Sequence, residues 1–201
     1  MTRIALFHSV LGVRPGVLAA ANVFRDAGHQ VEVIDQYDGR VFADYAEASA
    51  LAESIGYPVL MASALRAVAD DPGPLVTAGF SNGAGMAEYV AAARGGAAGG
   101  VLGSLQFSGA LPLEMTGVSQ WPVATPVQLH YSADDPFRDD AWVGGFVGDV
   151  AASGSPIETF LDYPIAGHLF TDASLPDEYD EASATLAFER ALAFLDRVPG
   201  G

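Results

Sequence analysis

Residues 79–83 read Gly-Phe-Ser-Asn-Gly and follow directly on a short apolar segment, residues 75–78. The residues that come after them, 85–94, have a helical composition. Because the two glycines let a strand and a helix approach closely, this pattern is typical of a sharp turn that exposes its serine at the carboxyl end of a central strand. The pattern therefore predicts a buried strand, a turn with Ser81 at its tip, and a helix that packs back on the strand.

The rest of the chain alternates between strand-like and helix-like segments. Continuous apolar runs are typical of strands that are buried on both faces. Alternation of this kind predicts an α/β fold with a mostly parallel, doubly wound sheet, helices on both faces and right-handed crossovers, in one domain over residues 1–201. Besides residues 75–78, the expected strands are residues 4–7, 31–34, 101–107, 127–131 and 157–160. Besides residues 85–94, the expected helices run from Pro15 to a stop at Gly28, over 44–70 with a break at 56–58, and over 140–152 and 180–198.

The charged residues exclude several functions. Nine basic against twenty-five acidic residues give a net charge of −16, which disfavours nucleic acid as a partner. All the basic residues are arginine, so Schiff-base chemistry on lysine and the lysine-containing phosphate loop are excluded. The absence of cysteine excludes disulfides, thiolate metal sites and a cysteine nucleophile. With no signal peptide or membrane span recognisable, we expect a soluble cytoplasmic protein.

A serine nucleophile needs a histidine base and a carboxylate that orients it, and both follow Ser81 in the order serine, acid, histidine. Asp134 and Asp135 lie in the loop that follows the expected strand at 127–131, and His168 lies in the loop that follows the last expected strand. Because the carboxyl ends of parallel strands meet at one edge of a sheet, these side chains are expected beside Ser81. We favour Asp135 as the acid and keep Asp134 as the alternative.

Other residues complete the hypothesis. The backbone N–H of Asn82, at the start of the helix that follows the turn, is placed to donate to an oxyanion, aided by the helix dipole.

The other three histidines have no catalytic role in this hypothesis. His29 is expected in solvent, His130 packed within its strand, and His8 close enough to approach the crevice. Four scattered histidines without cysteine make a poor metal site, so no metal and no cofactor is expected. Six aromatic residues follow strand ends and are either cavity lining or core: Phe80, Phe107, Tyr131, Phe137, Trp142 and Phe170.

Five segments together resemble the dienelactone hydrolase family, and the resemblance covers nearly the whole chain. The most specific segment is the last, the one that contains His168. The five are residues 7–12 (Phe-His-Ser-Val-Leu-Gly), 35–40 (Asp-Gln-Tyr-Asp-Gly-Arg), the turn at 79–83, 134–137 (Asp-Asp-Pro-Phe) and 163–170 (Tyr-Pro-Ile-Ala-Gly-His-Leu-Phe).

The resemblance implies an α/β-hydrolase fold and a triad of Ser81, Asp135 and His168, because the aspartate of the family directly precedes the Pro-Phe step. It also implies that the loop at residues 9–12 supplies a second oxyanion donor, the backbone N–H of Val10.

Three departures from the family pattern bear on the nucleophile and on the substrate. Well-known members have cysteine at the position of Ser81, a glutamate at about the position of Ser9, and an arginine at the position of Asp172 that helps to hold a substrate carboxylate.

Charge and chain length limit the expected substrate. An acidic residue near the entrance and a net charge of −16 should repel anions, so we expect neutral esters or lactones. A chain of 201 residues leaves little for a lid domain, so we expect a shallow site and a small acyl group.

The sequence therefore predicts a serine hydrolase that cleaves small carboxylic esters or lactones through an acyl-enzyme, as a monomer or homodimer with no membrane or nucleic-acid partner. The alternative is a non-catalytic protein that binds a small molecule on the same fold. A nucleotide-binding domain is disfavoured, because residues 8–16 contain two glycines at the wrong spacing for a phosphate loop.

Overall fold

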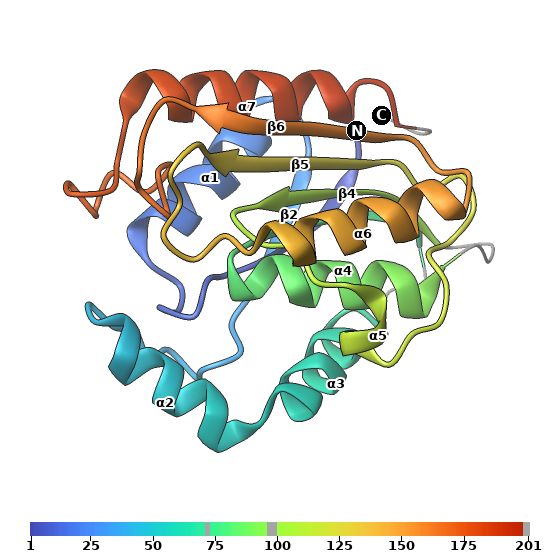
Figure 1. The fold of residues 1–201 in the computed structure, drawn as a ribbon, viewed down its shortest axis with the longest axis horizontal. Coiled ribbons are helices and arrows are strands. Elements are labelled where there is room, and N and C mark those ends of the chain that lie inside the picture. Colours follow the sequence, from blue (N-terminus) through green and yellow to red (C-terminus); the bar gives the residue numbers. More distant parts are fainter. Residues whose placement is uncertain (71–72, 96–99, 199–201) are drawn as a thin grey trace.

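The structure is a computed structural model that describes residues 1–70, 73–95 and 100–198. In this part of the chain, six parallel strands form one open sheet in the order β2-β1-β3-β4-β5-β6 (Figure 1). The chain moves outward from β1 to β2 and then continues in the opposite direction from β3, so the topological switch point lies between β1 and β3. The strands are β1 Arg3–Phe7, β2 Gln30–Ile34, β3 Leu75–Phe80, β4 Val101–Phe107, β5 Val127–Ser132 and β6 Ile157–Tyr163.

Helices cover both faces of the sheet, so the predicted doubly wound α/β fold is confirmed. Helices α1 and α7 pack together on one face, and α4 packs on β1, β3 and β4 from the other, where α6 also lies (Figure 1). The helices are α1 Pro15–Asp26, α2 Tyr45–Ile55, α3 Tyr57–Ala67, α4 Asn82–Arg94, α5 Leu113–Thr116, α6 Asp140–Ala152 and α7 Glu181–Leu195.

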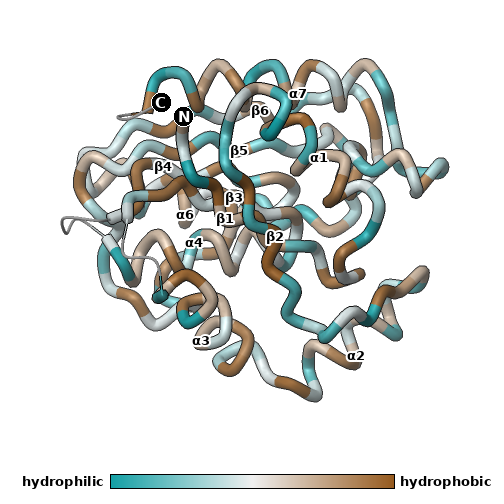
Figure 2. The backbone as a smooth tube through the Cα atoms, turned by 180° about the vertical axis from the view of Figure 1, so that it is seen from behind, coloured by the Kyte–Doolittle hydropathy of each residue, from teal (hydrophilic) through white to brown (hydrophobic). Residues whose placement is uncertain are grey.

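The central strands form the core. Every residue of β3 and β5 is buried, whereas the edge strands β2 and β6 are partly exposed. Figure 2 shows the hydrophobic residues concentrated along the strands at the centre of the molecule. Burial on both faces explains why the central strands appear in the sequence as continuous apolar runs.

Helices α2 and α3 form a layer beyond α4, which α3 contacts (Figures 1 and 2). They meet at an angle of 81° at Gly56, whose φ of 90° is a backbone conformation that glycine adopts freely. No single helix in the described part of the chain is long and apolar enough to cross a membrane. Helices α2 and α3 have the length and apolar composition of a membrane span only if the bent pair is counted as one helix.

Several element boundaries differ from the predictions by a few residues, and one short helix was not predicted. Strand β6 continues to Tyr163, beyond the expected residue 160, because Tyr163 still pairs with Ser132 across a register shift. Helix α4 begins at Asn82 rather than at residue 85, since the two glycines in its first turn hide the helical pattern. The short helix α5 was not predicted, because four residues carry no usable periodicity.

Candidate active site

The turn between β3 and α4 holds Ser81 in a strained conformation. Its φ of 52° and ψ of −119° lie outside the regions that non-glycine residues favour, and its N–H donates to the carbonyl of Phe107 over 2.7 Å. A Cβ at Gly79 would collide with the Gly83 carbonyl, and one at Gly83 with the His8 carbonyl. Only glycine at these two positions lets α4 start this close to the sheet, so the turn forms as the sequence predicted.

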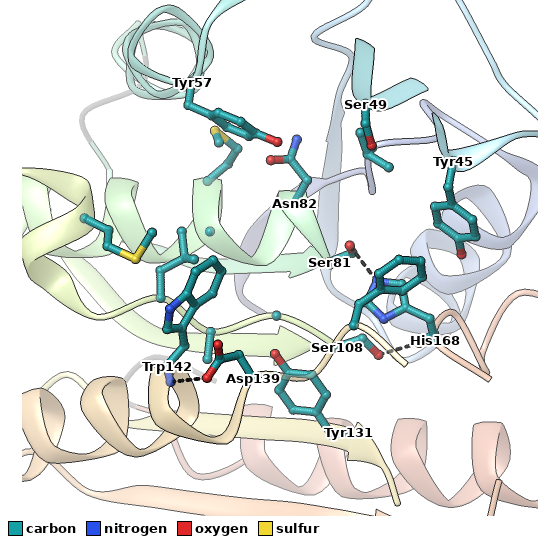
Figure 3. Close-up of a pocket in the computed structure, with 18 of the residues that line it drawn as sticks. Tyr45, Ser49, Tyr57, Ser81, Asn82, Ser108, Tyr131, Asp139, Trp142 and His168 are labelled. Atoms are coloured by element: carbon teal, nitrogen blue, oxygen red, sulfur yellow. Dashed lines mark hydrogen bonds between the residues drawn. The ribbon is translucent and has the colours of Figure 1, made fainter. Parts of the chain in front are cut away.

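A continuous chain of hydrogen bonds joins the three predicted side chains. The Nε2 of His168 lies 2.7 Å from the Oγ of Ser81 (Figure 3). Its Nδ1 lies 2.8 Å from both carboxylate oxygens of Asp135. Asp135 is buried, whereas Asp134 is exposed, and the hydrogen bonds of His168 Nδ1 go to Asp135. The structure therefore brings Ser81, His168 and Asp135 together and leaves the alternative acid outside the site.

Further hydrogen bonds hold the acid and the base in place. The N–H of Phe137 donates to Asp135 over 2.8 Å, and the hydroxyl of Ser108 donates to the carbonyl of His168 over 2.6 Å. Ser108 follows β4 and has a φ of 54°, so the carboxyl end of this strand also carries a strained residue. The sequence analysis missed Ser108; its only signal was a small polar residue directly after a buried strand.

Glu178 ties the loop of His168 to helix α2. Its carboxylate accepts the N–H of Leu169 over 2.7 Å and the hydroxyl of Tyr45 over 2.9 and 3.0 Å. Burial and the neighbouring carboxylate raise the pKa of Tyr45, so its hydroxyl stays a donor. The ring of Tyr45 lies 6.0 Å from that of His168. No local pattern marks this contact, because 133 residues separate Tyr45 from Glu178.

Ser81 and His168 open into a cavity of about 460 Å³ between the strand ends and helices α2 and α3 (Figure 3). A volume of this size suits a small-molecule ligand, and the expectation of a shallow site is wrong, because α2 and α3 supply a wall without an added domain. Of the six aromatic candidates, Tyr131, Phe137 and Trp142 line the cavity. The other three, Phe80, Phe107 and Phe170, are core residues.

The two predicted oxyanion donors both belong to residues that line the cavity, Val10 and Asn82. Asn82 is the first residue of α4, so its N–H is one of the helix N–H groups without a partner inside the helix. Val10 lies in the loop after β1, on the other side of the switch point, and the hydroxyl of Ser9 accepts the N–H of Leu11 to shape this loop. Their role as donors stays a prediction.

Asp172 does not stand at the entrance, and the prediction that it repels anions there is wrong. It is buried, and its carboxylate accepts the Nε of Arg14 over 3.2 Å and the N–H and hydroxyl of Ser174 over 2.9 and 2.6 Å. The acidic side chain that lines the cavity is instead Asp139, the N-cap of α6. The pairing of Asp172 with Arg14 bridges 158 residues and has no local signal in the sequence.

The remaining histidines serve the fold. His8 is buried, with Nδ1 2.6 Å from the Ser9 carbonyl and Nε2 accepting the N–H of Gln36, and it does not line the cavity. His130 is buried in β5, as expected. His29 is half-buried rather than fully solvated, and its Nδ1 lies 3.4 Å from the N–H of Thr2. Within the described ranges, no group of three or more histidine, aspartate or glutamate side chains is placed to hold a metal.

Residues 2–198 match the sequence model of the dienelactone hydrolase family. The chain belongs to this family. Curated proteins provide no match to the sequence. As a member of the dienelactone hydrolase family with an α/β-hydrolase fold, the chain is a hydrolytic enzyme.

Solved structures with low sequence identity share the fold. A dienelactone hydrolase-like promiscuous phosphotriesterase from metagenomic libraries is 18% identical with a TM-score of 0.82, over 98% of this chain and 87% of that one. Mouse α/β-hydrolase domain-containing protein 10 is 14% identical with a TM-score of 0.70, over 97% and 90%. The esterase PE8 is 17% identical with a TM-score of 0.66, over 98% and 93%.

Proposed function

We propose that this chain is a serine hydrolase that cleaves neutral carboxylic esters or lactones through an acyl-enzyme. The observation that carries the proposal is the unbroken relay from Asp135 through His168 to Ser81, whose hydroxyl faces a cavity of ligand size. Nucleophile, base and orienting carboxylate lie within the hydrogen-bond distances that this chemistry requires.

In the first half of the reaction, the Oγ of Ser81 attacks the carbonyl carbon while the Nε2 of His168 takes its proton. The carboxylate of Asp135 accepts the Nδ1–H, fixes the tautomer and stabilises the imidazolium. The N–H groups of Val10 and Asn82 donate to the oxyanion, which also lies at the positive end of the α4 dipole. When the tetrahedral intermediate collapses, the C–O bond to the leaving group breaks and His168 gives that oxygen the proton.

In the second half, a water molecule attacks the acyl-enzyme. His168 takes the proton of the water, and it returns this proton to Ser81 as the carboxylic acid leaves. Serine has no accessible anion near neutral pH, so both halves depend on His168 as the base. This dependence distinguishes the site from one built on a cysteine.

The charges at the cavity favour neutral substrates. Asp139 lines it, and no arginine is among the described residues that do so. Arg14 is engaged elsewhere, because its guanidinium donates to Asp172, to the Phe42 carbonyl and to Ser174. A substrate carboxylate would therefore meet a negative side chain without a cation to compensate it.

The Ser81→Ala variant tests the proposal. It should lose hydrolysis of p-nitrophenyl butanoate and labelling by a fluorophosphonate, while its thermal unfolding stays close to that of the unsubstituted protein. Leu186→Gln, a change at an exposed position of α7, is the control and should retain both properties. An unsubstituted protein that neither turns over the ester nor reacts with the probe would instead support a non-catalytic binding protein.

A further inference from the structure

Methionine gathers in the cavity. Three of the four methionines of the chain line it, and they come from three helices: Met61 from α3, Met86 from α4 and Met115 from α5. Methionine is flexible and polarizable, and it adapts to apolar groups of varied shape. Three of these four adaptable apolar side chains therefore line the cavity that contains Ser81, and such a lining suits a hydrocarbon group.

The mouth of the same cavity exposes large apolar side chains. Ten large hydrophobic side chains are exposed in the described part of the chain, and four of them line this cavity, although they belong to four separate segments. Exposed apolar surface that surrounds a cavity indicates a binding site, because it costs free energy in water unless a ligand covers it. The four are Tyr57, Met115, Phe137 and Trp142.

Three of these four side chains lie on one side of the nucleophile, whereas Phe137 packs against the ring of His168 at 4.8 Å. In Figure 3, Tyr57 and Trp142 lie on the side of Ser81 away from His168, whereas Tyr45 lies beside the histidine. Met61 shares α3 with Tyr57, and Met115 lies on α5, which packs against α6, the helix of Trp142. The cavity thus has an apolar side opposite the base.

The position of the base fixes which part of an ester enters this side. His168 must reach the leaving oxygen to protonate it, so the alcohol portion lies on the histidine side of Ser81. The acyl substituent points away from the leaving oxygen across the tetrahedral carbon. We propose that the apolar side, defined by Met61, Met115, Tyr57 and Trp142, is an acyl subsite that binds an extended, uncharged hydrocarbon chain.

This inference rests on the proposed function and specifies its substrate class. The esters best hydrolysed carry a neutral acyl chain of medium length, with Asp139 at the same side to disfavour an acyl group that ends in a carboxylate. Each methylene that the subsite buries contributes about 0.8 kcal/mol, or roughly a fourfold gain in kcat/KM when its burial is complete in the transition state.

Two isomeric esters test the subsite directly. Ethyl hexanoate and hexyl acetate have the same formula, but the long chain is acyl in one and alcohol in the other. After correction for their rates of alkaline hydrolysis, kcat/KM should favour ethyl hexanoate by about tenfold. Met115→Gln should reduce this ratio about threefold, whereas Leu186→Gln, which is equally exposed but lies on α7, should leave it unchanged. A ratio near one, or a preference for hexyl acetate, would overturn the proposal.

A binding measurement separates failure of the subsite from failure of the proposed function. Trp142 lines the cavity, whereas the other tryptophan, Trp121, is buried against Phe146. In the Ser81→Ala variant, ethyl hexanoate should change tryptophan emission in a saturable way, and Trp142→Phe should remove the change. If the emission changed in a saturable way but the unsubstituted protein did not turn over the ester, the proposed hydrolase function would be wrong and the acyl subsite would be supported. If the emission did not change, the acyl subsite would be contradicted, whether or not a fluorophosphonate labels the protein.

Discussion

One histidine lies in strand β5 and another in the loop that follows the neighbouring strand β6, and both are almost fully buried. His130 sits within β5, where its Nδ1 is 2.8 Å from the hydroxyl of Tyr163 and its Nε2 is 2.9 Å from the Oε1 of Gln128. Its ring stacks on Phe107 at 4.8 Å. His168 lies beyond the end of β6, between the carboxylate of Asp135 and the hydroxyl of Ser81.

The difference shows that burial alone does not make a catalytic base. Burial, together with the nearby Arg190 cation, lowers the pKa of His130 to about 3, so this ring remains neutral among neutral partners. His168 instead has an anion at one nitrogen and a hydroxyl at the other, and it faces a cavity. Two aspartates repeat the contrast, because Asp172 is paired with Arg14 inside the protein and Asp139 lines the cavity.

The largest expected effect comes from His168. His168→Asn should lower kcat for p-nitrophenyl butanoate by about 10⁵-fold, because Ser81 then has no base, while the midpoint of thermal unfolding moves by only a few degrees. Steady-state kinetics and calorimetry on the same preparation measure both. If kcat fell by less than tenfold, His168 would not be the base, and the contrast with His130 would have no functional meaning.

A somewhat smaller loss is expected at the acid. Asp135→Asn should lower kcat by about 10⁴-fold, because an amide supports the wrong tautomer of His168. Asp134→Asn is the matched control, since that neighbouring side chain is exposed, and it should change kcat by less than twofold. If the two variants lost activity equally, the assignment of the acid would be wrong.

His130 should matter to stability rather than to activity. The unfolded chain binds a proton on this ring below about pH 6.5, whereas the folded protein does not until about pH 3. The free energy of unfolding should therefore be undiminished above pH 6.5 and fall as the pH drops toward 3, by on the order of 5 kcal/mol from this group.

Urea unfolding at several pH values, compared between the unsubstituted protein and His130→Phe, isolates the contribution of this ring. The variant leaves Tyr163 and Gln128 without their partner, so its stability is lower throughout, but its slope between pH 3 and 6.5 should be shallower. Identical slopes would mean that His130 is protonated in the folded protein.

The smallest effect concerns the two aspartates. Asp139→Asn should raise kcat/KM for a carboxylate-bearing ester about threefold relative to its methyl ester, because the charge at the cavity is removed while asparagine still caps α6. Asp172→Asn should leave this ratio unchanged, since Arg14 already neutralises that carboxylate. The reverse result would restore Asp172 as the residue that repels anions.

The sequence predicted the six strands, their parallel arrangement and the region of the candidate site because these depend on local patterns. Apolar runs mark the buried strands, and the carboxyl ends of parallel strands must share an edge, so Ser81, Asp135 and His168 were expected together. The choice between Asp134 and Asp135 needed the resemblance to a family, since both follow the same strand. The structure places only the second within reach of the histidine.

Contacts between distant segments were not predictable. The wall formed by α2 and α3 was missed, because helical periodicity locates a helix without showing what it covers. The pairing of Arg14 with Asp172 was missed for the same reason, and this changed the expected position of a negative charge. Tertiary packing set both, and neither leaves a pattern in a short stretch of sequence.

Glu178 gives the site a mechanical property. One carboxylate holds both the backbone beside His168 and the hydroxyl of Tyr45 on α2, so the wall of the cavity and the catalytic base share an anchor. A displacement of α2 large enough to widen the entrance must break or stretch one of these two bonds. The width of the entrance and the alignment of Asp135, His168 and Ser81 therefore cannot change independently of each other.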